Sequence, residues 1–188
     1  MAASPEKIAL VLEFDPAALC AAAGFADPGG ETLAFAATCA DALASGLEAW
    51  RIADPARAGG PNGPDGFLLL AVAAGIEAEF SETFARSPSR GYLAQTLAAQ
   101  VLTRAAAQLM PELAALGCAP FLAPSPPVRE AMSSLGVDWL EPGGLSRALA
   151  ALTPMPYRGG CEVCLLAGSC PRLRGGKPER DAQKKWFL

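Results

Sequence analysis

"FLLLAVA" (67–73) is an unbroken apolar run of strand length, and "AGIEAEF" (74–80) follows it directly. A short run that is apolar at every position is typical of a strand buried on both faces. Gly75 then opens a helical pattern that we expect to continue to about Phe84. The sequence therefore predicts a central buried strand that leads straight into a helix.

The longest helical pattern of the chain comes next, in "YLAQTLAAQVLTRAAAQLMPELAALG" (92–117), after a break that we expect at "SPSRG" (87–91). Pro111 lies inside this pattern. A proline in a helix interior removes a hydrogen bond and clashes with the preceding turn, so we expect a kink or break there. Further along we expect an irregular segment at 118–127, with room for a short strand at 119–122. A short helix ended by Gly136 should follow, and the chain should then return to the core through Val137 and Trp139. We expect a final short helix at 145–155.

Upstream of the central strand, "KIALVLEF" (7–14) is an apolar run of strand length. Asp15 is a good N-cap and Pro16 suits the first position of a helix, so a helix should begin there. Gly24 can end it in a left-handed conformation. Two more segments are assigned by pattern: a long helix at 31–54 and an exposed Pro- and Gly-rich connection at 55–66.

These elements alternate irregularly and include few strands. We therefore predict an α+β fold: one helix-rich domain with a small mixed or antiparallel sheet and an irregular C-terminal cysteine loop. A length of 188 residues fits one domain with a small appendage. We place the body at 1–156 and the cysteine-rich loop and basic tail at 157–188.

Composition excludes several classes of function. No long apolar run reads as a membrane span or a signal peptide, so we expect a cytoplasmic protein with reduced thiols and no membrane partner. The chain has no histidine, which rules out a Ser-His-Asp triad and any histidine metal ligand. Residues 171–188 carry six Lys/Arg against two Asp/Glu, a net charge of +4, which leaves −8 for residues 1–170. This tail is too short and too poor in aromatics to indicate nucleic acid.

Three of the six cysteines lie close together in "CEVCLLAGSCPRLR" (161–174), with the spacing C-x2-C-x5-C. Thiolates are ligands for zinc and for iron–sulfur clusters. Cys161, Cys164 and Cys170 supply three ligands, and Cys118 is the best candidate for a fourth. A closed zinc site normally wants four N or S ligands, and the motif itself supplies only three. An iron–sulfur cluster also takes four, but one of its irons can be held by a distant cysteine or an exogenous ligand, so we favour the cluster. Zinc and a set of free thiols or a labile disulfide remain as alternatives. We expect the three cysteines outside this motif to be small buried hydrophobes: Cys20, Cys39 and Cys118. Cys118 is kept apart from the other two because it lies at a loop and could approach the cysteine motif.

Glu77, Glu79 and Glu82 lie close in sequence after Gly75. Glu79 and Glu82 share a helix face and could act as paired carboxylates. Negative charge is favourable near a helix N-terminus, so our interpretation is a solvated acidic face.

Three stretches resemble the vitamin B12-dependent methionine synthase activation-domain family. "LEFDPAALCAAAGF" (12–25) is similar to the opening strand and helix of that family. "FLLLAVAAGIEAEFSETFARSPSRGYLAQTLAAQVL" (67–102) looks like its central strand, turn and long helix. The cysteine motif is similar to the end of free-standing members found in anaerobes.

This resemblance implies an α+β domain that works beside a corrinoid and binds S-adenosylmethionine or cobalamin. It implies a corrinoid protein or methyltransferase as partner. The residues expected to line the cofactor cleft are Ala73, Gly75, Pro124 and Ser125. A low-potential electron is needed to reactivate a corrinoid, and an iron–sulfur centre could supply it.

The functional hypothesis is therefore an accessory protein of corrinoid-dependent methyl transfer, acting in reactivation, electron delivery or corrinoid handling. The alternative is a non-catalytic interaction protein in which zinc or an iron–sulfur cluster staples the tail to the body. A third possibility is a small electron-transfer protein without a corrinoid.

Overall fold

The computed structural model describes residues 3–57, 65–116, 118, 120–141, 143–157, 161 and 164–170. Its elements are, in order, β1 (Pro5–Ile8), α1 (Pro16–Ala22), α2 (Gly30–Gly46), β2 (Leu47–Ala53), β3 (Gly66–Val72), α3 (Ala74–Arg86), α4 (Pro88–Leu109), α5 (Pro111–Leu116), α6 (Pro126–Ser134), β4 (Trp139–Leu140), β5 (Gly144–Leu145), β6 (Ala150–Met155) and the 3-10 turn η2 (Ala167–Ser169). This is the helix-rich α+β fold that the sequence predicts. The boundary expected at residue 157 stays a prediction.

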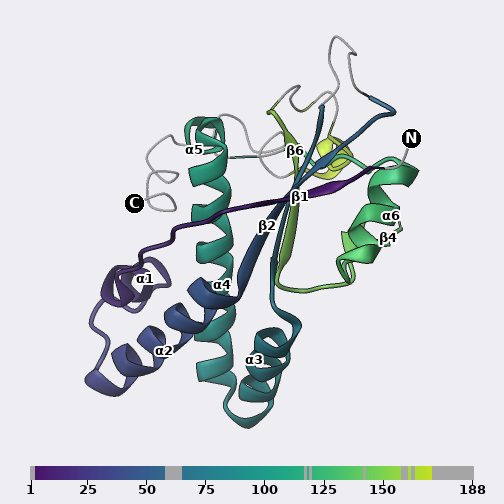
Figure 1. Ribbon diagram of the computed structural model, residues 1–188. Helices are drawn as coiled ribbons and strands as arrows, with labels where there is room; N and C mark the ends of the chain where they lie inside the picture. The colour runs from purple at the N-terminus through teal and green to yellow at the C-terminus, as the bar shows by residue number, and fades with distance from the viewer. Residues whose placement is uncertain are drawn as a thin grey trace.

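The main sheet has the strand order β1-β2-β3-β6, and every neighbouring pair is antiparallel (Figure 1). β3 lies inside the sheet, and all seven of its residues are buried. Leu69 of β3 pairs with Trp50 on one side and with Leu152 on the other. The central buried strand predicted from its continuous apolar run is confirmed, and it leads directly into α3.

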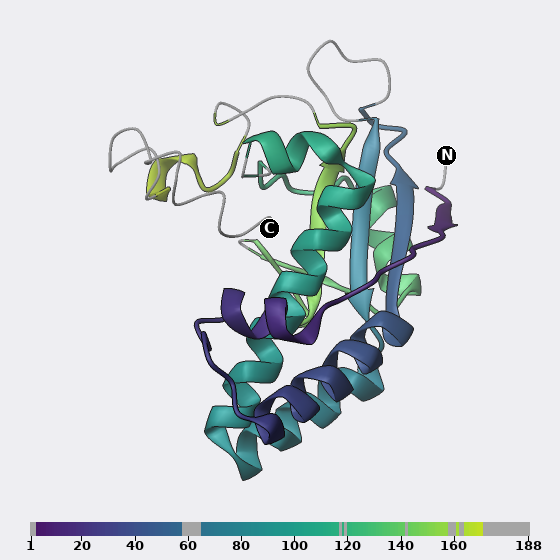
Figure 2. The same ribbon diagram turned by 90° about the vertical axis from the view of Figure 1, so that its left-hand side faces the viewer.

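The two faces of β3 serve two separate layers of the core. Leu68, Leu70 and Val72 pack with α1, α2 and α4, while Phe67 and Leu69 pack with α6 and the segment after it. Figure 2 shows α4 and α6 on opposite sides of the strands. A strand that is covered on both faces has no polar face, which explains why this run carries no alternation.

Several local predictions are confirmed by backbone geometry. The Ala17 N–H donates to Asp15 Oδ1 at 2.9 Å, so Asp15 caps α1. Gly24 ends that segment with a φ of +92°, and Gly136 follows α6 with a φ of +73°. α4 and α5 are separated at Met110, immediately before Pro111. None of the described helices is long and apolar enough to cross a membrane.

The helix predicted at 31–54 is wrong beyond its middle. α2 ends at Gly46, and Leu47–Ala53 forms β2. The helical apolar stripe continues past Gly46, but pairing with both β1 and β3 outweighs this local preference. Trp50 and Ile52, an aromatic and a β-branched residue, carried the strand signal.

The final helix predicted at 145–155 is also wrong. Gly144–Leu145 forms β5, and Ala150–Met155 forms β6, which pairs with β3. The alanine-rich composition favours helix, but without β6 the apolar edge of β3 would lose its hydrogen-bonding partner.

Smaller corrections concern element bounds. β1 covers Pro5–Ile8 rather than 7–14, and Leu10, Leu12 and Phe14 reach the core from irregular backbone. Only Ser87 separates α3 from α4, so the break at 87–91 is shorter than expected. The described residues of 119–122 form no strand. Residues 58–64 of the predicted connection lie outside the described part of the chain.

Cys20 and Cys39 are buried, as expected for small hydrophobes, at 0% and 3% exposure. Burial, with smaller contributions from Glu79 and Cys20, raises the pKa of the Cys39 thiol to about 11. Burial also raises the pKa of the Cys20 thiol. All six cysteines are at described positions, and none of them forms a disulfide.

The Cys39 thiol predicts a loss of stability in alkali. Between pH 9.0 and about 11 the folded state keeps a proton that the unfolded chain has lost, so the free energy of unfolding should fall as the pH rises. Urea unfolding at a series of pH values measures this. Cys39→Ala should show a shallower decrease than the wild type, and equal slopes would contradict the prediction.

Candidate metal centre

The cysteine loop is wound from short backbone turns. The Cys164 N–H donates to Cys161 O at 3.3 Å, the Ala167 N–H to Cys164 O at 3.1 Å, and the Cys170 N–H to Ala167 O at 3.3 Å. Each turn therefore advances the chain by three residues. Ala167–Ser169 of this loop forms the 3-10 turn η2.

The body of the protein holds the loop at Phe121. The Phe121 N–H donates to Cys164 Sγ at 3.3 Å, and the Leu165 N–H donates to Phe121 O at 2.8 Å. Cys164 is partly buried, whereas Cys161 is exposed. Amide hydrogen bonds to sulfur are a typical outer contact of metal-bound thiolates.

Residues 120–125, which we call the strap, connect this contact to the sheet. The Phe121 ring stacks on Trp139 with centroids 5.3 Å apart. Arg57 Nη2 donates to Ala123 O at 2.9 Å, and the Ser125 hydroxyl donates to Asp54 Oδ1 at 2.7 Å. The strap therefore lies between the cysteine loop and the carboxyl end of β2.

Asp54 is fully buried directly after β2. Its Oδ1 accepts from Ser125 and from the Ala56 N–H, and its Oδ2 lies 3.6 Å from Arg57 Nε. A buried carboxylate is costly unless it is hydrogen-bonded and paired. Oδ1 is hydrogen-bonded, whereas the buried Oδ2 has no hydrogen bond and only the ion pair with Arg57. Asp54 thus fixes Ser125, the N-cap residue of α6.

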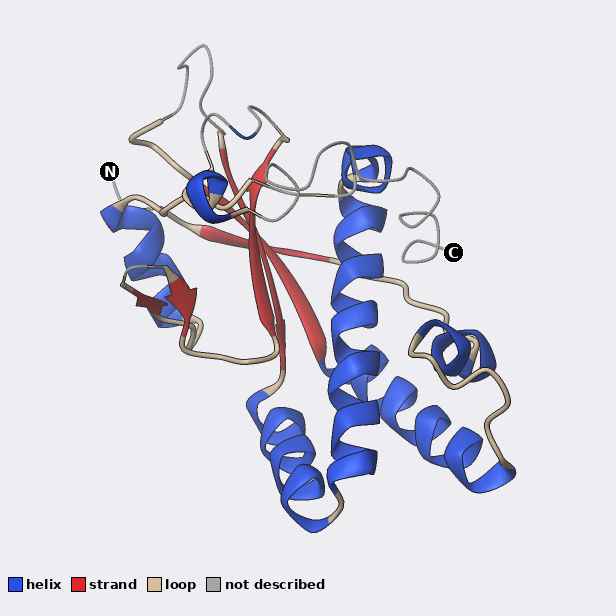
Figure 3. Ribbon diagram, turned by 180° about the vertical axis from the view of Figure 1, so that it is seen from behind, coloured by secondary structure: helices blue, strands red, loops and turns tan. Residues whose placement is uncertain are grey.

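The structure separates the four residues predicted to line a cofactor cleft into two pairs. Pro124 and Ser125 are buried in the strap, which contacts Cys164 through Phe121. Ala73 and Gly75 lie at the start of α3, where the Ala73 N–H donates to Gly46 O at 2.8 Å, next to the opposite end of β2. Figure 3 shows η2 and α3 at opposite ends of the sheet. A seven-residue strand spans about 23 Å, so the two pairs do not line one cleft.

The four predicted metal ligands all lie at described positions. Within the described residues, no group of three or more Cys, Asp or Glu side chains is close enough together to hold a metal ion. Cys118 is exposed, so the burial expected of it is wrong: it lies outside the helices and strands that form the core. It lies three residues before Phe121 and is therefore within about 11 Å of that residue along the chain. The donor chemistry, four thiols without histidine, fits iron–sulfur or zinc.

A shallow cavity of about 170 Å³ lies elsewhere, between α2 and α4. Arg90 pairs with Glu31 there, and its guanidinium lies 5.6 Å from the centroid of the Phe35 ring. The opposite charges of Glu31 and Arg90 in the cavity wall therefore neutralise each other. The lining residues include no cysteine: Phe25, Glu31, Thr32, Phe35, Ser89, Arg90 and Leu93.

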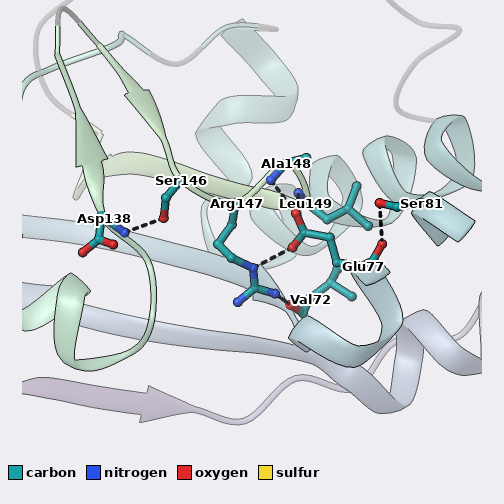
Figure 4. A network of polar contacts seen from close by, with 8 residues as sticks. All are labelled: Val72, Glu77, Ser81, Asp138, Ser146, Arg147, Ala148 and Leu149. Atoms are coloured by element: carbon teal, nitrogen blue, oxygen red, sulfur yellow. Dashed lines mark hydrogen bonds and ion pairs between the residues drawn. The ribbon is translucent and has the colours of Figure 1, made fainter. Parts of the chain in front are cut away.

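Sequence reasoning missed a polar network at the start of α3 (Figure 4). Glu77 Oε2 lies 2.6 Å from Arg147 Nε, and Glu77 Oε1 accepts the Ala148 N–H at 2.6 Å. Arg147 also donates to Val72 O. Both charged side chains are only 17% exposed, so the solvated face expected for Glu77 is wrong. The partner lies 70 residues away, and no local pattern indicates it.

Comparisons with family models, curated proteins and solved structures find no match to this chain.

Proposed function

We propose that the cysteine loop binds an iron–sulfur cluster through Cys161, Cys164 and Cys170, with Cys118 as the fourth ligand. On this proposal the chain is an accessory protein of corrinoid-dependent methyl transfer, acting in reactivation, electron delivery or corrinoid handling. The observation that carries the metal site is the hydrogen bond from the Phe121 N–H to Cys164 Sγ.

Two features of the chain support a thiolate centre. A backbone amide that donates to sulfur stabilises the thiolate form, which is the form that binds metal. The loop backbone also winds in three-residue turns between the cysteines. Ligand binding would then require the loop and Cys118 to close together, as expected where metal binding completes local folding.

A bound cluster would supply a low-potential electron for a corrinoid partner. The chain's own residues would hold the centre in place: Phe121 fixes Cys164, and the strap ties the loop to the body. Pro124 and Ser125 lie in this strap, so they are the predicted cofactor-lining residues nearest to the cysteines. The resemblance of three stretches to the activation-domain family supports the corrinoid part, with cobalamin preferred over S-adenosylmethionine.

A structural staple is the second candidate, with zinc or a cluster in the same thiolates. The observation that favours it is the hydrogen bond from the Leu165 N–H to Phe121 O. This contact joins the loop to the body and needs neither electron transfer nor a corrinoid. A metal in this position would fix the loop against the strap.

Titration with cobalamin separates the two functions. Protein loaded with iron and sulfide under anaerobic conditions is mixed with increasing cob(II)alamin, and binding is followed by electron paramagnetic resonance. We expect saturable binding, and reduction of the cobalt by the pre-reduced iron form but not by a zinc-loaded form. S-adenosylmethionine is titrated in parallel. Metal-loaded protein that binds neither molecule would contradict the corrinoid function and favour the staple.

A further inference from the structure

Both backbone groups of Phe121 contact the cysteine loop. Its N–H donates to Cys164 Sγ at 3.3 Å, and its carbonyl accepts the Leu165 N–H at 2.8 Å. One residue of the body therefore holds the sulfur of one cysteine and the backbone of the next residue. This contact joins positions 43 residues apart in sequence.

The side chain of Phe121 is fixed from two directions. Its ring stacks on Trp139 at 5.3 Å, and the Arg129 guanidinium lies 5.7 Å from the centroid of the Trp139 ring. A Cβ atom built at Gly143 would lie 2.9 Å from Phe121 Cε1, so the chain passes close to the ring on another side. Arg129 Nε also donates to Pro124 O at 3.0 Å. The N–H that faces Cys164 is thus presented from an ordered support.

An N–H that donates to a ligand sulfur has two physical effects. It orients the sulfur, and loss of such an outer contact typically lowers metal affinity about 10- to 100-fold. It also stabilises negative charge on the sulfur. The reduced form of a metal–thiolate centre carries more negative charge than the oxidised form, so the hydrogen bond raises the reduction potential.

We propose that Phe121 is the positioning residue of the thiolate centre. Its backbone N–H donates to Cys164 Sγ while that sulfur is bound to metal, and this contact sets the metal affinity and the reduction potential of the site. The inference depends on the proposed metal site. It adds that the body of the protein, and not the loop alone, tunes that site.

Cadmium-113 provides a direct test, because it replaces zinc in thiolate sites and its nuclear spin couples through a ligand sulfur to a hydrogen-bonded proton. The full chain, labelled with ¹⁵N, is loaded with ¹¹³Cd²⁺. We expect a ¹¹³Cd-edited proton spectrum to show the amide proton of Phe121. Cadmium bound by sulfur without this coupling would overturn the inference and leave the metal site intact. Failure to bind cadmium would instead contradict the metal site, and the inference with it.

Two proline variants separate tuning from simple docking. Phe121→Pro removes the N–H that donates to Cys164 Sγ but keeps the Phe121 carbonyl. Leu165→Pro removes the hydrogen bond from the Leu165 N–H to Phe121 O but keeps the hydrogen bond from the Phe121 N–H to Cys164 Sγ. Phe121→Leu keeps both backbone groups and controls for the ring.

We expect Phe121→Pro to bind Cd²⁺ about 10- to 100-fold more weakly than Phe121→Leu. The iron-loaded form of Phe121→Pro should have a more negative reduction potential, with no such shift in Leu165→Pro. Circular dichroism of the metal-free variants checks that each one is folded. Equal affinities and potentials in folded Phe121→Pro and Phe121→Leu would overturn the inference, and the cadmium coupling in the wild type decides the matter if Phe121→Pro does not fold.

Discussion

Replacing Glu77 by alanine is expected to lower the free energy of unfolding by about 2 to 4 kcal/mol. The carboxylate pairs with Arg147 and accepts the Ala148 N–H, both at 2.6 Å. Alanine would leave a largely buried guanidinium and a backbone amide without this partner. Removing one member of a buried pair typically costs about 3 to 5 kcal/mol, and the 17% exposure of both side chains reduces this figure.

Urea unfolding followed by circular dichroism measures the effect. Glu82→Ala is the matched control, because Glu82 lies on the same helix and pairs with Arg86 where both side chains are 72% exposed. That variant should lose less than about 0.5 kcal/mol. Similar losses in the two variants would show that the Glu77 pair does not hold β6 to α3.

Replacing Gly91 by alanine should destabilise the protein by about 2 to 3 kcal/mol, although alanine is the better helix former. A Cβ atom at Gly91 would lie 2.3 Å from Phe84 Cα, which is backbone of α3. A flexible side chain could move aside, but here the two helices must separate. The close approach of α3 and α4 therefore depends on the missing side chain.

Gly75→Ala provides the control, because no atom lies within 4 Å of a Cβ built at Gly75. Glycine to alanine at such an open helical position is expected to be neutral or to stabilise by up to about 1 kcal/mol. Thermal unfolding should show a lower midpoint for Gly91→Ala and an equal or higher one for Gly75→Ala. Equal midpoints for Gly91→Ala and the wild type would contradict the predicted clash.

Local signals predicted those parts of the fold that local forces decide. The run at 67–73 has no polar face because both of its faces are covered, and Asp15 with Pro16 starts a helix through its own side chain and ring. The sequence predicts helix for β2 because the apolar stripe of the preceding helix continues past Gly46, and for β6 because that segment is rich in alanine. Their strand conformation comes from pairing with β3, and those partners are not visible in a window of ten residues.

The candidate site likewise has one part that local sequence predicts and another part that depends on distant partners. The cysteine spacing predicts Cys164 as a metal ligand from local sequence alone. The residue that contacts its sulfur, Phe121, does so through a backbone N–H, which every residue except proline possesses. No side-chain pattern could therefore have indicated it. Asp54 and Ser125 likewise meet across 71 residues of sequence.

The strap connects the cysteine loop to the core of the protein. It joins Cys164, through Phe121, to a fully buried carboxylate at Asp54, so the loop is held by the same core that holds the sheet. Ala73 and Gly75, at the other end of β2, are not part of this arrangement. On the proposed function, substitutions in the strap should therefore affect metal binding more strongly than substitutions at the start of α3.

Iron and acid-labile sulfide content, measured in protein produced and purified without oxygen, shows whether the cysteine loop binds an iron–sulfur cluster. We expect comparable amounts of iron and sulfide with broad visible absorbance in the wild type. Both should be retained in Cys39→Ala and lost in the triple variant Cys161→Ser, Cys164→Ser, Cys170→Ser. Wild-type protein without iron and sulfide, or a triple variant that retains both, would contradict an iron–sulfur cluster bound by the cysteine loop.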